Sequence, residues 1–225
     1  MTPPAIVAGA LAEGLMMIAI CDHNSARNAA AVQAAAGARL AVLAGMEITS
    51  AEECHVVGLF PDAHAAEAAG ERVAAALPEV DQEYTAFFGS QDVLNERGEI
   101  VGRETRALAA ASPLGVTACV DLVHGLGGLA VAAHVDRRSF GVISQLGVFP
   151  HDAGFDAVEL SRHVAPGSDD EARFAALGLP LLRSSDAHFV ADIGAGRCVL
   201  SLEAADFASL AAALGARRTG SLPDA

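Results

Sequence analysis

The sequence predicts an α/β fold with a mostly parallel sheet, and three observations lead to this prediction. Short apolar runs alternate with alanine-rich helical segments along the 225 residues. Most apolar runs lack the polar–apolar alternation of a half-exposed strand, as expected for strands buried on both faces. The connections between them are short, as in βα units. We expect one α/β domain over residues 1–225, with residues 61–112 as a helix and hairpin insertion.

The first 60 residues predict the order helix, strand, helix, strand, strand. Thr2 can cap a first helix, proline suits its first turn, and Gly14 suits its end. The expected elements that follow are a strand over residues 15–21, a helix from Asn24 or Ser25 to Ala36, and strands over residues 40–46 and 55–60.

Residues 61–112 interrupt this rhythm, which returns from residue 116. The segment predicts a helix over residues 63–77 and a hairpin within residues 91–103, with Gly98 in its loop. The expected later strands are residues 129–133, 155–160, 179–183 and 197–202, and the expected helices are 116–126, 139–146, 169–177 and 204–214, with a loose tail from Arg217.

Composition excludes some classes of function. With 14 basic and 28 acidic residues the formal net charge is −14, so we expect no broad binding to a nucleic-acid backbone. No apolar run is long enough to span a membrane, and no signal peptide is evident, so we expect a cytoplasmic protein. The oligomeric state stays open. The four dispersed cysteines predict buried, reduced thiols.

Metal-ligating side chains follow several predicted strands. They are His23, Glu47, His55, His134, and the pair Asp186 and His188. The carboxyl ends of parallel strands meet at one edge of a sheet, so we expect these groups to converge. Imidazole and carboxylate are usual ligands for zinc, manganese and iron. An extended Asp186-Ala187-His188 segment would point both side chains the same way and serve two ions.

Each of these residues taken alone has a simpler explanation, which stays open. A histidine at a strand end is commonly a core or surface residue, and Glu47 or Asp186 can cap a turn. Only the repeated occurrence of such groups at successive strand ends favours a shared metal site.

Several motifs together resemble the PHP (polymerase and histidinol phosphatase) domain family across residues 3–214. The matching segments are Cys21-Asp22-His23-Asn24, Gly45-Met46-Glu47-Ile48, His55-Val56-Val57-Gly58, Ala132-Ala133-His134 and Ser185-Asp186-Ala187-His188, with similar phrases at residues 155–161 and 192–194. The resemblance implies a distorted (β/α)7 TIM-like barrel that holds up to three divalent ions, zinc, manganese or iron, and hydrolyses phosphate esters.

The resemblance also implies a role for each matching residue. Glu47 would bridge two ions and share one of them with His55 and His134. Asp186 would bind the other, while His23 and His188 would bind a third. Asp22 would orient a ligand or carry a proton, and together with His23 it is our candidate for catalysis.

One part of the family pattern has no counterpart. The family's first strand ends in His-x-His, but no histidine precedes His23. We therefore expect the first barrel strand and its ligands to be missing. A start at an internal methionine is our expectation, and a truncated variant with impaired activity is the alternative.

Together these features predict a metal-dependent phosphoesterase. We expect a metal-activated water to attack a small phosphate monoester, nucleotide or short oligonucleotide. Arg137, Arg162 and Arg183 are candidates to bind the phosphate. The expected partner is a small phosphorylated substrate, without a membrane. Two alternatives remain: a metal-dependent hydrolase of C–N or lactone bonds, and a non-catalytic metal-binding domain.

Overall fold

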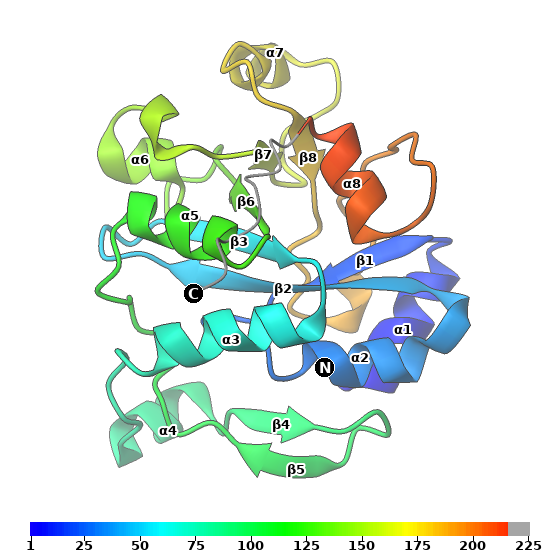
Figure 1. Ribbon diagram of the computed structural model, residues 1–225, viewed down its shortest axis with the longest axis vertical. Helices are drawn as coiled ribbons and strands as arrows, with labels where there is room; N and C mark the ends of the chain where they lie inside the picture. The colour runs from blue at the N-terminus through cyan, green and yellow to red at the C-terminus, as the bar shows by residue number, and fades with distance from the viewer. Residues whose placement is uncertain (216–225) are drawn as a thin grey trace, which may run out of the picture.

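The computed structural model describes residues 1–215, and a curled six-stranded sheet forms its centre. Figure 1 shows this sheet between helices, with α7 and α8 at one end and a small hairpin at the other. The strands lie in the order β1 (Met17–Ile20), β2 (Ala41–Thr49), β3 (His55–Phe60), β6 (Leu129–Ala132), β7 (Ala157–Leu160) and β8 (Leu181–Arg183). The α/β class is confirmed, whereas a count of seven barrel strands is not confirmed.

Strand β3 is the exception to the parallel arrangement that the sequence predicts. It runs antiparallel to both β2 and β6, whereas the pairs β1–β2, β6–β7 and β7–β8 are parallel. A short turn after β2 reverses the chain, and His55 then pairs with Thr49 at the carboxyl end of β2. The start of β3 therefore lies at the edge of the sheet where its parallel neighbours end.

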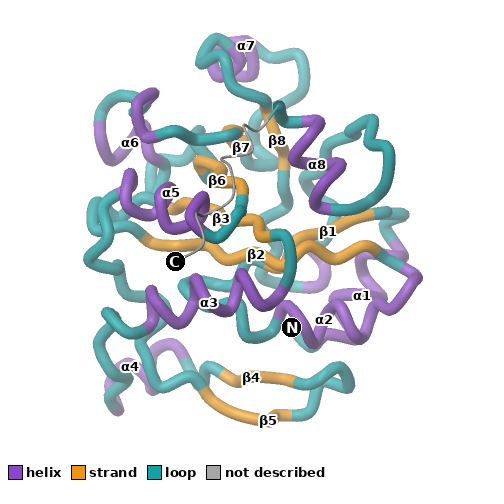
Figure 2. The backbone as a smooth tube through the Cα atoms, in the orientation of Figure 1, coloured by secondary structure: helices purple, strands orange, loops and turns teal. Residues whose placement is uncertain are grey.

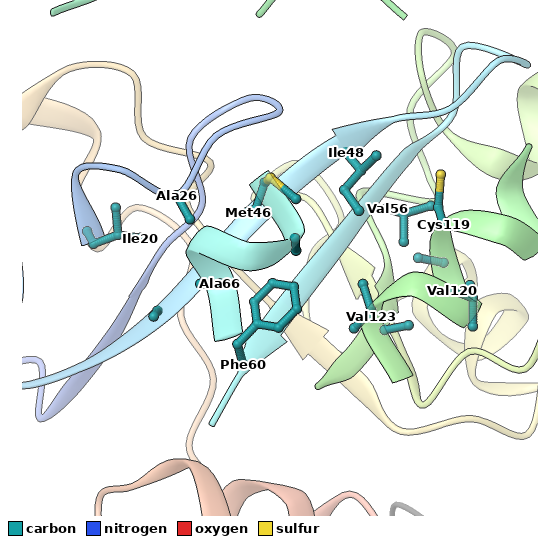
Figure 3. Close-up of a cluster of buried hydrophobic side chains, with 14 of the residues drawn as sticks. Ile20, Ala26, Met46, Ile48, Val56, Phe60, Ala66, Cys119, Val120 and Val123 are labelled. Atoms are coloured by element: carbon teal, nitrogen blue, oxygen red, sulfur yellow. The ribbon is translucent and has the colours of Figure 1, made fainter. Parts of the chain in front are cut away.

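Helices cover the outer, convex face of the sheet. These are α1 (Pro3–Ala12), α2 (Ala29–Ala36), α3 (Ala63–Ala74) and α5 (Val116–Gly125). They bury alternate residues of the strands, among them Ile20, Met46, Ile48, Val56 and Phe60. Figure 3 shows Met46 and Phe60 beside Ala66 of α3, with Ile48 and Val56 toward Cys119, Val120 and Val123 of α5. Small alanine side chains let the helices approach the strands closely.

The strand residues between these buried positions point to the inner face of the sheet. Leu43, Val57, Leu59, Leu129 and Val131 form a second, smaller cluster there. Helix α8 (Phe207–Ala213) packs on this face through Phe207, Leu210 and Leu214, the three residues that the sequence places on one side of that helix. Since side chains alternate along a strand, Glu47 and Glu159 point to this inner face as well.

Part of the segment 61–112 projects away from the sheet. Helix α4 (Gln82–Phe88) and the hairpin of β4 (Asp92–Leu94) and β5 (Ile100–Arg103) form this part, and Figure 2 shows them below α3. The predicted hairpin is confirmed, and Gly98 adopts a φ of 82° in its loop. Helix α3, by contrast, buries Ala66, Ala69 and Val73 in the main core.

The remaining elements are short, and two expectations about the chain are wrong. Helices α6 (Val142–Leu146) and α7 (Asp169–Ala175) flank β7, with 3-10 turns at Gly37–Arg39, His151–Ala153 and Val190–Asp192. The strand expected over residues 197–202 is absent from the described part of the chain, and Val199 there is 96% exposed. The helix expected from Asn24 or Ser25 begins only at Ala29, and residues 24–28 are not helical. The tail expected from Arg217 lies outside the described residues.

The cysteines agree with the sequence-based expectation in part. All four are free, and Cys54 and Cys119 are buried, but Cys198 is exposed. Residues 1–215 contain no helix that is both long enough and apolar enough to cross a bilayer.

Candidate metal centre

Glu47 is the buried carboxylate around which the predicted ligands gather. It lies on the inner face of β2, and only 6% of its surface is exposed. The backbone holds it from the neighbouring chain: Asn24 N–H donates to the Glu47 carbonyl at 2.8 Å, and Glu47 N–H donates to the Asp22 carbonyl at 3.0 Å. The turn after β1 is thereby fixed beside the end of β2.

Three histidines surround this carboxylate. Nδ1 of His23 lies 3.1 Å from Oε2 of Glu47, and Nδ1 of His55 lies 3.2 Å from the same oxygen. Nε2 of His134 lies 3.5 Å from the other oxygen, Oε1. Nδ1 of His55 and Nε2 of His134 are 3.1 Å apart. The structure thus brings together four residues that come from four different segments of the sequence.

Burial and the imidazoles act in opposite directions on these ionisable groups. Burial tends to raise the pKa of Glu47, but hydrogen bonds with His134 and His55 outweigh it, and the pKa lies well below its ordinary value. Burial lowers the pKa of His23, which favours the neutral, ligating form. Burial also tends to lower the pKa of His134, yet the bond to Glu47 raises it overall.

This donor set fits a divalent cation. Ligand atoms of His23, Glu47 and His55 all lie within 4.8 Å of one another. Neutral imidazole nitrogens and a charged carboxylate are the groups that zinc, manganese and iron bind. Among the described residues, the buried Nδ1 of His134 is a side-chain nitrogen without a hydrogen-bond partner. A buried polar atom without a partner is uncommon outside functional sites.

Asp186 and His188 lie in the loop after β8 rather than in an extended strand. Strand β8 ends at Arg183, and Asp186 adopts a left-handed φ of 44°. The expectation that an extended segment points both side chains the same way is therefore wrong. The ring of His188 is 6.1 Å from that of His23, and its Nδ1 is 3.0 Å from the Asp186 carbonyl. His188 thus borders the site at an exposed position.

The three arginines that the sequence suggested for phosphate binding all have carboxylate partners. Arg137 donates to Asp186 at 2.6 Å, beside the candidate metal centre. Arg162 pairs with Asp192 at 2.7 Å, and Arg183 pairs with Glu171 at 2.6 Å. Only the pair formed by Arg137 involves one of the predicted ligands. Phosphate binding by these arginines stays a prediction.

Asp22 and Asn28 form a polar connection next to His23. Nδ2 of Asn28 donates to Oδ2 of Asp22 at 3.2 Å. Burial raises the pKa of Asp22, although this hydrogen bond offsets part of the effect. Asp22 also lines a cavity of about 720 Å³ together with Glu47, Glu159 and Asp186. The cavity extends between β1 and β8 along the inner face of the sheet.

Sequence reasoning missed several residues of this site. Burial raises the pKa of Glu159, on the inner face of β7, to about 7, and Oε1 of this carboxyl accepts a long hydrogen bond of 3.4 Å from His134 N–H. A glutamate inside an apolar strand is the signal that could have identified it. Asn24 is completely buried, and the ring of Phe140 stacks on His55. Asn24 belongs to a segment that resembles the family, but the local sequence does not reveal its buried contacts, and nothing local marks Phe140.

Comparison with known proteins supports the resemblance in two independent ways. A family model described as PHP-associated matches residues 171–219. A proposed metal-dependent phosphoesterase from Bifidobacterium adolescentis shares the fold with a TM-score of 0.60 at 19% identity, covering 95% of this chain and 90% of that one. The resemblance to the PHP family is thereby confirmed. No curated protein matches the sequence.

Two further solved structures have the same fold. An amidohydrolase from Chromobacterium violaceum, with bound sulfate and no metal, gives a TM-score of 0.59 at 21% identity and covers 88% of this chain and 87% of that one. Endonuclease Q, bound to a 27-mer duplex with an abasic lesion at its active site, gives 0.64 at 14% identity. The match covers 96% of this chain but 52% of endonuclease Q.

The endonuclease Q complex corrects our expectation about partners. We expected a small phosphorylated substrate from the motifs and, from the net charge of −14, no broad binding to a nucleic-acid backbone. That exclusion is wrong, because a protein with this fold is seen with a DNA duplex at its active site. The physical reason is that local charges, bound cations above all, dominate the field at such a site, so the net charge of a chain does not decide the partner.

Proposed function

We propose that this chain is a metal-dependent phosphoesterase of the PHP type, with nucleic-acid strands within its substrate range. The observation that carries the proposal is the arrangement of three imidazoles around one buried carboxylate, Glu47. Glu47, His55 and His134 would hold the ion, and His23 would complete the set from the exposed side. A divalent ion in this position lowers the pKa of a bound water and neutralises charge on phosphate oxygens.

The side chains next to these ligands supply the proton transfers. Burial raises the pKa of Asp22, so this carboxyl keeps a proton more readily than an exposed aspartate does. It lines the same cavity as Glu47, which makes it suited to protonate the leaving oxygen. The side chain of His23 is 38% exposed and can reach substrate from the solvent side. Asn28 holds Asp22 in place through its amide.

Arg137 is the arginine that we assign to the phosphate. It lies three residues after His134 and donates to Asp186, and 32% of its side chain is exposed. A guanidinium binds two phosphate oxygens in parallel, so a phosphate can take the place of the Asp186 carboxylate. Asp186, released from this pair, would be the residue to hold a second ion. Arg162 and Arg183 are engaged with acidic residues elsewhere and are weaker candidates.

Hydrolysis of a C–N bond is the second candidate function. The observation that favours it is the shared fold with the amidohydrolase from Chromobacterium violaceum. A cation that activates water can serve either reaction, since both need an attacking hydroxide and a stabilised oxyanion. The two candidates differ in the bond that is cleaved, and a substrate panel separates them.

The decisive experiment measures hydrolysis and metal content on the same purified chain. The chain is stripped with a chelator and reloaded with zinc, manganese or iron(II). A short single-stranded DNA, a generic aryl phosphate and a set of amides and lactones are then offered. We expect phosphate release or strand cleavage only in the reloaded samples. Cleavage of amides or lactones without any phosphoester cleavage would replace the proposal by its alternative, and no bound metal would refute both.

A further inference from the structure

The loop of residues 134–141 contains one predicted metal ligand and contacts two others. It begins at His134 itself, its Arg137 donates to Asp186, and its Phe140 stacks on His55. The loop is tight: Arg137 N–H donates to the His134 carbonyl at 2.9 Å. A Cβ at Gly141 would lie 2.5 Å from the Arg137 carbonyl oxygen, so the turn leaves no room for a side chain there.

Phe140 has an unusual position at the end of this loop. Its ring lies nearly parallel to that of His55, with 4.4 Å between centroids and 12° between planes. Its carbonyl accepts a hydrogen bond of 2.9 Å from His55 N–H. The backbone adopts a φ of 60°, a left-handed conformation that is rare for a bulky residue, and 40% of the residue is exposed. Such strain is found mainly where function requires it.

Shielding of His55 explains only one face of this ring. Phe140 covers a histidine that is 7% exposed, yet 40% of Phe140 itself stays exposed and available to a ligand. The same loop carries Arg137, whose guanidinium donates to Asp186, so an aromatic ring and a positive charge lie beside the candidate metal centre. Aromatic faces next to positive charge are the means by which proteins stack and hold nucleobases.

We propose that Phe140 is a specificity-determining residue on which a nucleobase of the substrate stacks while its phosphate is at the metal centre. This inference rests on the proposed function and deepens it, because it specifies a phosphate ester that carries a flat ring. The inner face of Phe140 positions His55, and the outer face receives the base. Arg137, which donates to Asp186, would bind the phosphate that follows the base.

The test compares two ligands that differ only in the base. Thymidine 5′-phosphate and 2-deoxyribose 5-phosphate are titrated calorimetrically into the metal-loaded chain, and strand cleavage is measured separately. The variants are Phe140→Leu, which keeps apolar bulk but loses the ring, and Phe140→Tyr, which keeps the ring. Phe87→Leu is the matched control, because Phe87 on α4 is 81% exposed and contacts another aromatic ring, that of Phe88, edge to face. Metal content and the unfolding temperature report whether each variant is folded.

We expect the parent chain to bind the thymidine ligand at least about fivefold more tightly than the sugar phosphate. This factor corresponds to the lower end of the affinity gained when one base stacks on an aromatic ring. Phe140→Leu should reduce this ratio to near one without loss of metal, while Phe140→Tyr and Phe87→Leu should retain it. Equal binding of both ligands by the parent chain, no binding of either, or an unchanged ratio in folded Phe140→Leu would overturn the inference. If Phe140→Leu does not fold, Phe140→Tyr provides the test. Loss of the preference for the thymidine ligand in folded Phe140→Tyr would then overturn the inference, because this variant keeps the ring. Strand cleavage by the parent chain decides the proposed function independently of these results.

Discussion

The side chain of Glu47 combines burial with charge, and this combination decides what its replacement will do. Its carboxylate is 6% exposed and meets nitrogens of His23, His55 and His134. Glutamine in its place removes the negative charge that, in our proposal, would hold a cation among three imidazoles. The amide of glutamine has nearly the same volume, so the effect on metal binding can be separated from an effect on packing.

Glu47→Gln is therefore expected to abolish metal binding while leaving the fold intact. Bound metal should fall below what can be measured after dialysis. The rate of hydrolysis should fall by more than about 100-fold, because loss of a direct ligand should cost more than loss of a residue that only supports a ligand, which costs up to about 100-fold. Elemental analysis and a phosphoesterase assay on the same sample check this. Glu71→Gln, at an exposed position of α3, serves as the control. Full metal content in Glu47→Gln would show that the ion binds at a site that does not need the Glu47 carboxylate.

The four central residues could be predicted because each belongs to a recognisable local pattern. His23 follows an apolar strand, Glu47 interrupts the end of one, His55 begins one and His134 follows another. Glu159, a glutamate inside an apolar strand, offered a comparable signal, but the contacts of Asn24 and Phe140 could not be assigned in this way. Their roles depend on partners far away in the sequence, such as the contact of Phe140 with His55, which no local period encodes.

At the scale of elements, Asn24 joins three segments of the chain. Its side-chain Nδ2 donates to the carbonyls of Leu108 and Ala110, each at 2.9 Å, and its Oδ1 accepts from Thr49 N–H at 3.0 Å. The residue is completely buried and has a φ of 48°, a conformation that asparagine tolerates better than most residues. It therefore holds the end of the segment 61–112 against the turn that carries His23.

Replacing Asn24 should weaken both the fold and the metal centre. Asn24→Ala leaves buried backbone groups without partners, and each such group costs about 1–3 kcal/mol, so we expect a loss of about 2–4 kcal/mol in the free energy of unfolding. Asn24→Gly removes the same bonds but accepts the left-handed backbone, and it separates strain from lost hydrogen bonds. Denaturant titration and metal analysis measure the two effects. An unfolding free energy within about 0.5 kcal/mol of the parent in both variants would contradict this role.

Helix α5 is attached to β7 through a histidine that responds to pH. Nε2 of His124 lies 2.9 Å from Oδ2 of Asp156, which also accepts from Ala130 N–H at 2.8 Å. The hydrogen bond to Asp156 is the main cause that raises the pKa of His124. A histidine with a raised pKa in the folded state stabilises the protein fully below its unfolded pKa, near 6.5, and loses this contribution as the pH rises through the folded value.

His124→Gln should accordingly cost stability at low pH and much less at high pH. We expect a difference from the parent of about 1–2 kcal/mol at pH 5.5, shrinking toward pH 9. This is less than the about 1.5–3 kcal/mol of a buried hydrogen bond to a charged group, because the His124 side chain is 29% exposed. Denaturant titrations at several pH values measure it. His64→Gln, on the exposed side of α3, is the control and should show no such trend. A penalty that grows with pH would mean that the charged pair is not what holds α5.

The sequence predicted helices and strands better than it predicted the direction in which a strand runs or whether an apolar run pairs with the sheet. The apolar run at residues 55–60 identifies a buried strand, but nothing in it shows that β3 runs antiparallel to β2 and β6. The run at residues 197–202 looks similar, yet Val199 is almost fully exposed and forms no strand. Periodicity reports how side chains alternate, whereas pairing depends on which neighbours are present in space.

For the molecule as a whole, the open sheet has consequences that no single element shows. Within residues 1–215, β1 pairs with β2 and β8 pairs with β7, so the outer edge of each has no strand partner. Ala19 of β1 is exposed and lines the cavity along the inner face. Unpaired edges with apolar neighbours are templates for association with another chain, and natural sheets usually protect them with charge or cover.

We therefore expect the chain of residues 1–225 to associate through these edges as its concentration rises. Ala19→Lys places a charge on the edge and in the apolar cavity, and it should shift the sedimentation coefficient toward that of the monomer at the same concentration. Ala8→Lys, on the exposed side of α1, adds the same charge away from the sheet and should leave association unchanged. Sedimentation velocity over a range of concentrations measures all three proteins. A parent chain that stays monomeric at every concentration would show that the edges are not available for pairing. Equal effects of both lysines would show that net charge, and not the edge, governs association.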